Sequence, residues 1–245
     1  MIGMGIRSAR GLAMLVCLSA PAAATGADGL LHRLMRVLGM SSAPAQMRGA
    51  DSPATAGQIW LADLAGGATH ALRAGGGYRS PIFDSGGSTV VALAGKQIVR
   101  IAVDSGKTTD EWNASGIQKL VGADSQEPDE VLVVRDDRSA PLGILSLTTH
   151  KVTPLPPPDR TDKQQVEAVT AAAGQTRIYG NVRLFLQTKS RVAMEGKREW
   201  QDVYVQEGRQ TPRSISRCQD VTCDQPSLSP DGRQVLYIRS DAIDD

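Results

Sequence analysis

Two short hydrophobic segments separated by a glycine turn recur along this chain. In residues 225–238, QPSLSPDGRQVLYI, a short strand runs into the turn and an apolar strand follows it. Residues 81–93 repeat the arrangement at an offset of 145. The corresponding positions are Pro81 and Pro226, Gly87 and Gly232, and Val91 and Leu236. Apolar strands on both sides of a glycine turn are typical of a β-hairpin.

The same hairpin pattern occurs twice more between these segments, and a second hairpin pattern alternates with it. The equivalent apolar positions of the first pattern are Val91, Leu132, Ile178 and Leu236. Those of the second pattern are Leu64, Val103, Leu147 and Val205. Two hairpins per period of roughly forty residues amount to four strands per repeat, which is the blade of a β-propeller. The sequence therefore predicts an all-β fold, a propeller of about four four-stranded blades.

The best-defined repeat also carries a family resemblance. With its proline, its Ser-Pro-Asp-Gly turn and its apolar strand, QPSLSPDGRQVLYI resembles the WD-like propeller repeat of TolB and its relatives. The match is partial in residues 81–93, where DSGG replaces SPDG, and weak in the two middle repeats. The resemblance implies a periplasmic or extracellular propeller that binds proteins or peptides on one face. Repeats of this kind identify an architecture rather than an activity.

The order of the hairpins bears on how the propeller closes. The repeats begin with an outer hairpin at Gln58 and end with an inner hairpin near Arg239. We expect residues 58–72 to complete the last blade, because this hides edge strands that otherwise promote aggregation. Relatives of this repeat usually have six or more blades. The alternative is therefore that the chain is an incomplete piece of a larger propeller.

The first 24 residues differ from the rest of the chain. Arg7 and Arg10 precede the apolar stretch GLAMLVCLSA, and the small residues 22–24 follow it. This order is typical of a secretory signal peptide, and the apolar stretch is too short for a transmembrane helix. The sequence predicts cleavage after Ala24 and a periplasmic or secreted mature protein.

Residues 25–57 are expected to form a short helix and a linker ahead of the propeller, which spans 58–245. The apolar residues of segment 28–39 follow helical spacing: Leu30, Leu31, Leu34, Val37 and Leu38. One interpretation is a basic amphipathic helix that contacts a membrane or a partner. The preferred interpretation is a helix packed on the propeller.

Charge and cysteine content narrow the possible functions. The net charge of +1 provides no strong field for nucleic acid, which is not an expected partner. Removal of the signal peptide leaves Cys218 and Cys223, and an exported protein favours a disulfide between them over two free thiols. The three histidines are far from these cysteines in sequence, and no metal or cofactor is expected.

The tetrapeptide DSGG at 84–87 also surrounds the nucleophilic serine of trypsin-like proteases. In the repeat register, Ser85 takes the place of Pro230 in a turn between two strands. A serine nucleophile needs a histidine and an acid beside it, and His70 falls on an outer hairpin in this register. We therefore expect a turn without catalytic function. The sequence also contains no Gly-x-Ser-x-Gly nucleophile motif.

The links between successive blades should lie on one face of the propeller, together with the long insert at 187–201. The candidate protein-binding residues on this face are Tyr78, Arg79, Trp112, Asp159, Arg160, Arg191, Arg198, Trp200 and Arg217. Arginine and aromatic residues on loops are typical of a protein interface. Ordinary solvated loops are an equally weighted alternative.

These observations together predict a non-enzymatic, exported propeller that binds an envelope protein or peptide. The alternative is the propeller portion of an envelope peptidase, similar to the prolyl oligopeptidase family, or of another hydrolase. In that case the catalytic domain is absent from this chain.

Overall fold

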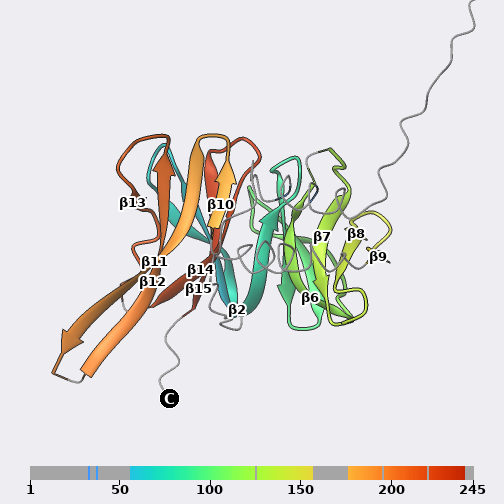
Figure 1. Cartoon of the computed structure of the whole chain (residues 1–245), viewed down its shortest axis with the longest axis horizontal. Coiled ribbons are helices and arrows are strands. Elements are labelled where there is room, and N and C mark those ends of the chain that lie inside the picture. The colour runs from blue at the N-terminus through green and yellow to red at the C-terminus, as the bar shows by residue number, and fades with distance from the viewer. Residues whose placement is uncertain are drawn as a thin grey trace, which may run out of the picture.

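The computed structural model describes residues 33, 37, 56–124, 126–156, 176–194, 196–219 and 221–240. This part of the chain is almost entirely β-structure, arranged as a row of antiparallel sheets (Figure 1). No helix within it is long and apolar enough to cross a membrane.

The strands form three hydrogen-bonded sheets. The largest has the order β14-β15-β1-β2-β3-β4-β5 and contains β1 (Gly57–Asp63), β2 (Thr69–Phe83), β3 (Thr89–Ala94), β4 (Gln97–Ala102), β5 (Thr108–Asn113), β14 (Thr222–Leu228) and β15 (Gln234–Ser240). The second contains β6 (Ile117–Ala123), β7 (Glu130–Arg135), β8 (Leu142–Ser146) and β9 (Val152–Pro154). The third contains β10 (Thr176–Tyr179), β11 (Val182–Ala193), β12 (Gly196–Glu207) and β13 (Arg213–Ser214).

Strand β2 belongs to two blades. Its first part pairs with β1, and its second part, from Tyr78 to Phe83, pairs with β3. The large sheet therefore consists of the blades β14-β15-β1-β2 and β2-β3-β4-β5. With the other two sheets, it gives four blade-like units of four strands. The all-β, propeller-like fold predicted from the sequence is confirmed.

The pairing of β1 with β15 joins the two ends of the repeat array. Its register runs from Gln58 opposite Arg239 to Asp63 opposite Gln234. The N-terminal hairpin thus completes the blade that the C-terminal hairpin begins, as the sequence predicted. Closure of the ring between the β6–β9 and β10–β13 sheets stays a prediction.

Two predictions about individual elements were wrong. The segment 73–80 is part of β2 rather than a loop between blades, and the positive φ of Gly75 (96°) and Gly77 (99°) lets the strand turn without ending. In the third repeat, Ile178 lies on β10, and β11 stands between β10 and β12. The weak repeat signal there concealed β11. Val91, Leu132 and Leu236 do occupy the second strand of their blades.

Two repeats share a backbone irregularity. Ser80 and Gln225 both precede a proline and both have positive φ, 49° and 53°. Strand pairing shifts register beside each of them, which is the geometry of a β-bulge. The backbone N–H of Ser80 donates a hydrogen bond to the side-chain oxygen of Gln225. Equivalent positions of two blades thus contact each other directly.

Among the described residues, the core lies between neighbouring blades and includes three clusters of buried residues. Ile59 and Leu236 pack with β3 and β4 residues such as Val90. Tyr237 packs on the other side of the same blade with residues of β11 and β12. The third cluster joins β3 and β4 to β6, β7 and β8. Burial raises the pKa of Tyr237 to about 12, so its ring stays neutral in the core.

Two residues of the predicted N-terminal helix are described, both in helical conformation. Val37 is buried, and Arg33 Nε lies 3.1 Å from the carboxylate of Asp124. The same guanidinium also contacts Glu130. These contacts are those expected of a segment packed on the propeller. The rest of segment 28–39 and the signal peptide lie outside the described residues, and the boundaries at 24 and 57 stay predictions.

The DSGG segment forms the turn between β2 and β3, as predicted. Asp84 accepts hydrogen bonds from the backbone N–H and hydroxyl of Thr89, and Ser85 Oγ donates to the carbonyl of Pro128 at 3.2 Å. The matching turn at 229–232 is held in the same way by an aspartate. There, hydrogen bonds from the Ser229 hydroxyl and from a backbone N–H hold the pKa of Asp231 below its usual value.

Candidate protein-binding surface

The predicted binding residues are distributed over several sheets. Of those that the structure describes, Tyr78 and Arg79 lie in β2, Trp112 lies in β5, and Arg217 lies in a link. The other three described residues, Arg191, Arg198 and Trp200, lie in β11 and β12. Asp159 and Arg160 lie outside the described residues. Most of the proposed face is therefore carried by strands rather than loops, because the links and the insert continue the flanking strands.

The insert forms a long hairpin that projects from its blade. In Figure 1, β11 and β12 extend well beyond the other strands at the lower left. Strand β10 pairs with β11 only from Val182 to Phe185, and β13 pairs with β12 only at Tyr204 and Val205. Beyond these rungs the hairpin is a two-stranded ribbon that continues to the pair Ala193–Gly196.

One face of this hairpin combines aromatic rings with cations. Side chains alternate between the two faces of a strand, and Leu184, Val203 and Val205 point into the core. The opposite face carries Gln187, Asp202 and Gln206 together with seven basic and aromatic residues: Arg183, Phe185, Lys189, Arg191, Arg198, Trp200 and Tyr204. We call these seven residues the basic hairpin face.

Contacts within the basic hairpin face order its rings and cations. The rings of Phe185 and Tyr204 stack with centroids 5.8 Å apart. The guanidinium of Arg183 lies 5.2 Å from the Phe185 centroid, and Lys189 Nζ lies 5.2 Å from the Tyr204 centroid. The contact with Tyr204 raises the pKa of Lys189, so this ammonium remains charged. The face thus presents charge and apolar area side by side.

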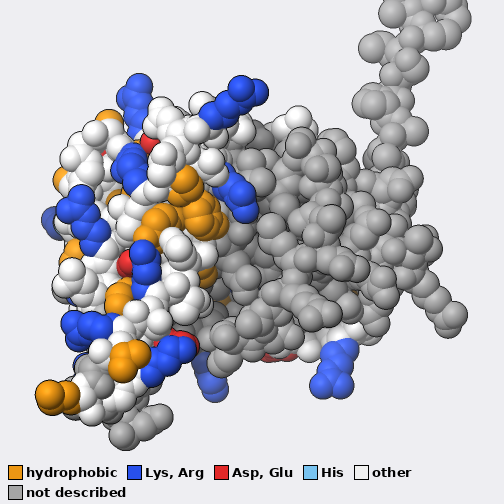
Figure 2. Space-filling view, turned by 60° about the vertical axis from the view of Figure 1, so that its left-hand side comes forward, with side chains coloured by type: hydrophobic (Ala, Val, Ile, Leu, Met, Phe, Trp, Pro, Cys, Tyr) orange, Lys and Arg blue, Asp and Glu red, His pale blue; other side chains and the backbone are white. Residues whose placement is uncertain are grey.

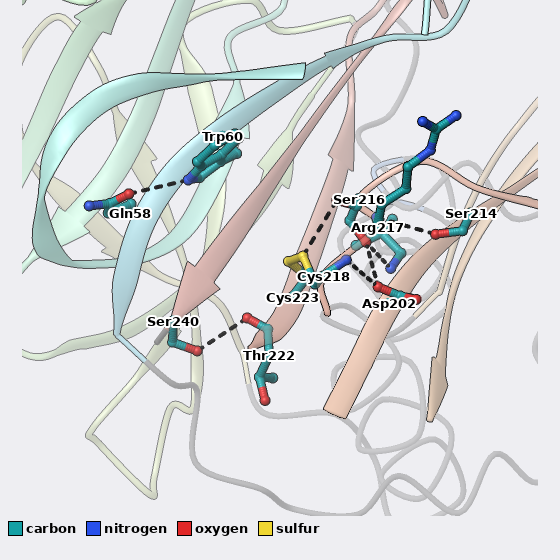
Figure 3. The surroundings of a disulfide bond; sticks show 11 residues. Gln58, Trp60, Asp202, Ser214, Ser216, Arg217, Cys218, Thr222, Cys223 and Ser240 are labelled. Carbon is teal, nitrogen blue, oxygen red and sulfur yellow. Dashed lines mark hydrogen bonds between the residues drawn. A yellow bond between two sulfur atoms is a disulfide. The ribbon is translucent and has the colours of Figure 1, made fainter. Parts of the chain in front are cut away.

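A buried hydrogen-bond network fixes the base of the hairpin (Figure 3). Asp202 accepts a hydrogen bond from the backbone N–H of Cys218 at 2.7 Å and another from the Ser216 hydroxyl at 3.2 Å. The Ser216 oxygen in turn accepts from the N–H of Val203 at 2.9 Å. Cys218 is joined to Cys223 at the start of β14. The link that carries Arg217 is thereby tied both to the hairpin and to the next blade.

The predicted disulfide between Cys218 and Cys223 is confirmed, and both sulfurs are buried. Disulfides of this kind are typical of proteins outside the cytoplasm. We expect thiol titration of the unreduced, denatured mature protein to find no free cysteine. Converting both cysteines to alanine should cost about 2 kcal/mol of stability by the loop-entropy estimate. Two titratable thiols in the native protein would contradict this prediction.

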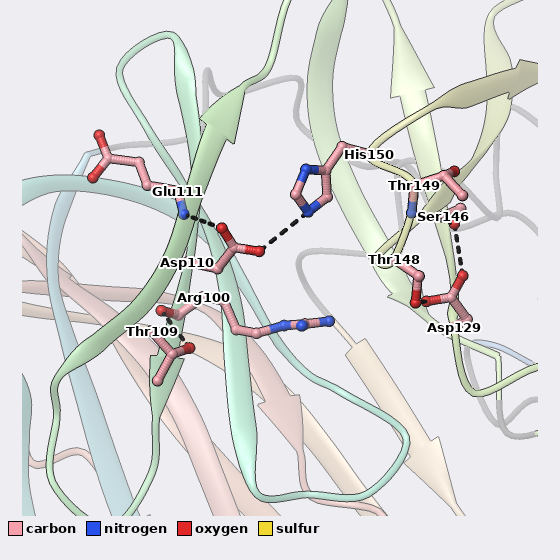
Figure 4. Close-up of polar contacts among 9 residues, drawn as sticks. All are labelled: Arg100, Thr109, Asp110, Glu111, Asp129, Ser146, Thr148, Thr149 and His150. Carbon is pink, nitrogen blue, oxygen red and sulfur yellow. Dashed lines mark hydrogen bonds and ion pairs between the residues drawn. The ribbon is translucent and has the colours of Figure 1, made fainter.

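Trp112 takes part in a separate contact between blades, beside the polar cluster around His150 that Figure 4 shows. Its ring stacks on His150 with centroids 4.2 Å apart, and His150 Nε2 lies 3.1 Å from Asp110 Oδ2. Nearby, Asp129 accepts hydrogen bonds from the hydroxyls of Ser146 and Thr148. Burial acts to raise the pKa of Asp129, but these hydrogen bonds and the charge of an arginine hold it below its usual value. This cluster joins β5 to the turn before β9. His150 and Thr148 are exposed, whereas Trp112 and Asp129 are half-buried.

The surface at the β10–β13 end of the molecule is rich in positive charge. The space-filling view that brings this end forward shows many Lys and Arg side chains, few acidic ones, and apolar patches between them (Figure 2). In the same part of the described chain, the large hydrophobic residues recorded as exposed are Val192 and Met194, at the end of the hairpin. No group of three potential metal ligands occurs among the residues described.

Lys189 lies within the predicted insert, but sequence reasoning missed the three members of this surface outside it: Arg183, Phe185 and Tyr204. The signal that could have identified them is the alternation in VRLFLQTK and WQDVYVQ, where apolar core residues alternate with a basic or aromatic one. Such alternation predicts a strand with one exposed face. The basic and aromatic side chains of the hairpin therefore occur at every second position, as in a strand with one exposed face.

No family model matches the chain, and no curated protein matches it. Among solved structures, it is similar to a putative TolB from Agrobacterium tumefaciens, with a TM-score of 0.32 and 12% identity over 75% of this chain and 62% of that one. It is also similar to the dihydro-heme d1 dehydrogenase NirN, with a TM-score of 0.28 and 14% identity over 79% of this chain and 41% of that one. The chain thus spans less than two thirds of either structure.

Proposed function

We propose that this chain is an exported, non-enzymatic propeller module that binds a protein of the cell envelope through the basic hairpin face. The observation that carries the proposal is the ordered set of rings and cations on β11 and β12. Tryptophan, tyrosine and arginine are the residues that contribute most to protein interfaces. The predicted signal peptide and the disulfide support a location outside the cytoplasm.

The rigid base of the hairpin also supports binding. Asp202, Ser216 and Cys218 hold β12 in place from one side, and the disulfide holds their link to β14. Rings and cations that are already positioned lose less conformational entropy when a partner binds. A partner with acidic and apolar residues fits this face, because its cations and rings lie side by side.

The test is capture of envelope proteins on the mature protein (residues 25–245), followed by affinity measurement with the partner identified. Trp200→Ala combined with Tyr204→Ala should weaken the complex about tenfold or more, since interface aromatics commonly contribute over 1.4 kcal/mol each. The matched control is Lys107→Ala with Arg138→Ala, which alters exposed residues on other blades. An equal loss of affinity in the aromatic pair and in the control pair would contradict the proposal, as would capture of partners from the cytosol alone.

A further inference from the structure

The end of the hairpin has a different character from the basic hairpin face. Val192 is 81% exposed and Met194 is fully exposed, so two large apolar side chains stand in solvent at the extremity of the molecule. We define the hairpin tip as Arg191, Val192, Met194, Lys197 and Arg198. Exposed apolar groups on a soluble protein commonly mark an interaction site.

The tip stands away from the body of the propeller. Residues Gln187 to Ala193 of β11 have β12 as their partner strand and lie beyond the rungs that β10 and β13 cover. Seven residues at about 3.3 Å each give an extension of about 23 Å. The tip can therefore reach a surface that the blades themselves do not touch.

Basic residues lie beside the apolar residues of the tip and one rung farther from its end. Arg191 pairs with Arg198 across the ribbon, one rung from the pair of Val192 and Lys197. Segment 187–201 contains four basic and two acidic residues, an excess of two positive charges, in a chain whose net charge is +1. Arg191 and Arg198 are both exposed, and Lys197 contacts Glu199.

We propose that the hairpin tip inserts into the surface of an anionic phospholipid bilayer. Val192 and Met194 enter the boundary between headgroups and acyl chains, while Arg191 and Arg198, one rung farther from the end, lie at the level of the phosphates. Lys197, in the same rung as Val192, reaches back to that level through its long side chain. Apolar residues first and cations behind them is the order that matches the depth profile of a bilayer interface. This goes beyond the proposed protein-binding function, which uses the rings nearer the base of the hairpin.

The test is co-sedimentation of the mature protein with vesicles of phosphatidylcholine containing one half phosphatidylglycerol, compared with vesicles of phosphatidylcholine alone. We expect binding to the anionic vesicles at low salt, weakened several-fold at 0.5 M salt. Val192→Ser with Met194→Ser should reduce this binding about tenfold or more, and Arg191→Ala with Arg198→Ala should do the same. The control pair, Lys107→Ala with Arg138→Ala, should leave it unchanged.

A second measurement reports insertion of the hairpin tip directly. Met194→Cys, labelled with a polarity-sensitive dye, places the probe at a fully exposed position that the fold does not use. Its emission should shift to the blue with anionic vesicles and remain unchanged with neutral ones.

Absence of anionic-vesicle binding by the wild-type protein would overturn the inference, as would a tip variant that binds vesicles normally. If the wild-type protein binds no vesicles and a tip variant loses capture of envelope proteins, the tip is a protein contact instead. Val192→Ser with Met194→Ser leaves all seven residues of the basic hairpin face intact, whereas Arg191→Ala with Arg198→Ala alters both surfaces, so the serine variant separates the two proposals. Failure of the membrane inference is therefore distinguishable from failure of the protein-binding proposal.

Discussion

Deletion of residues 58–72 is expected to unfold or aggregate the protein. The deletion removes β1 and the first part of β2, so the blade β14-β15-β1-β2 loses two of its four strands. Strand β15 then exposes the edge that pairs with Gln58 to Asp63. An unpaired, apolar edge strand is a template for aggregation.

The loss of buried apolar area supports the same expectation. Ile59, Leu61 and Leu72 are buried in the cluster between this blade and the next. Burial of three such side chains stabilises a protein by about 4 to 9 kcal/mol, which is comparable to the whole stability of a typical domain. The stacked pair of Trp60 and Tyr237, with centroids 6.5 Å apart, is lost as well.

The control for this deletion is Ser85→Ala. Ser85 lies in a turn, and its hydroxyl makes one hydrogen bond, to the carbonyl of Pro128. Its removal should cost at most about 1 kcal/mol and leave folding and binding normal. Circular dichroism, thermal melting and size-exclusion chromatography compare the two variants. A soluble deletion variant with a cooperative melting transition would show that the pairing of β1 with β15 contributes little, and would favour the incomplete-propeller interpretation.

The fold could be predicted from the sequence where short apolar strands recur after a turn at a regular period. Val91, Leu132 and Leu236 lie in such strands, whose central residues are buried on both faces, and all three lie in the second strand of a blade. The pairing of β1 with β15 could be predicted as well, because the hairpin order leaves two half-blades at the chain ends. Periodicity alone carried these predictions.

The third blade could not be predicted in the same way. Its insert lengthens two strands instead of forming a loop, and the pattern of residues 187–201 contains no glycine until Gly196. The binding surface was then assigned to links between blades. Two glycines with positive φ make one of those links, at Tyr78, part of a continuous strand. A strand that runs without a break from one blade into the next does not change the spacing of hydrophobic residues, so this spacing does not reveal it.

Gly106→Ala should destabilise the protein considerably more than Gly67→Ala, although the two glycines occupy equivalent turns. Gly67 N–H donates to Asp63 O and Gly106 N–H donates to Ala102 O, each at 2.9 Å. Their φ angles are 65° and 63°. In both turns an added Cβ costs about 1 to 2 kcal/mol, because an L-residue is strained in the left-handed region.

The surroundings of the two glycines differ. A Cβ on Gly67 would meet nothing within 4 Å, whereas a Cβ on Gly106 would lie 2.2 Å from the backbone oxygen of Leu72. Arg73 Nη1 also donates to the Gly106 carbonyl at 3.1 Å. The β4–β5 turn therefore presses on the backbone of β2, where one blade meets the next, and this backbone cannot move without disturbing β1.

We expect the clash to add about 1 to 3 kcal/mol to the cost of Gly106→Ala, the usual range for overpacking. In a protein of this size, each kcal/mol lowers the Tm by about 2–4 °C. Thermal melting of the two variants beside the wild type measures the difference, with Gly67→Ala supplying the backbone strain alone. Equal melting temperatures would mean that the turn and β2 do not touch, and that the two blades pack less closely than the core cluster of Ile59, Leu72 and Val99 requires.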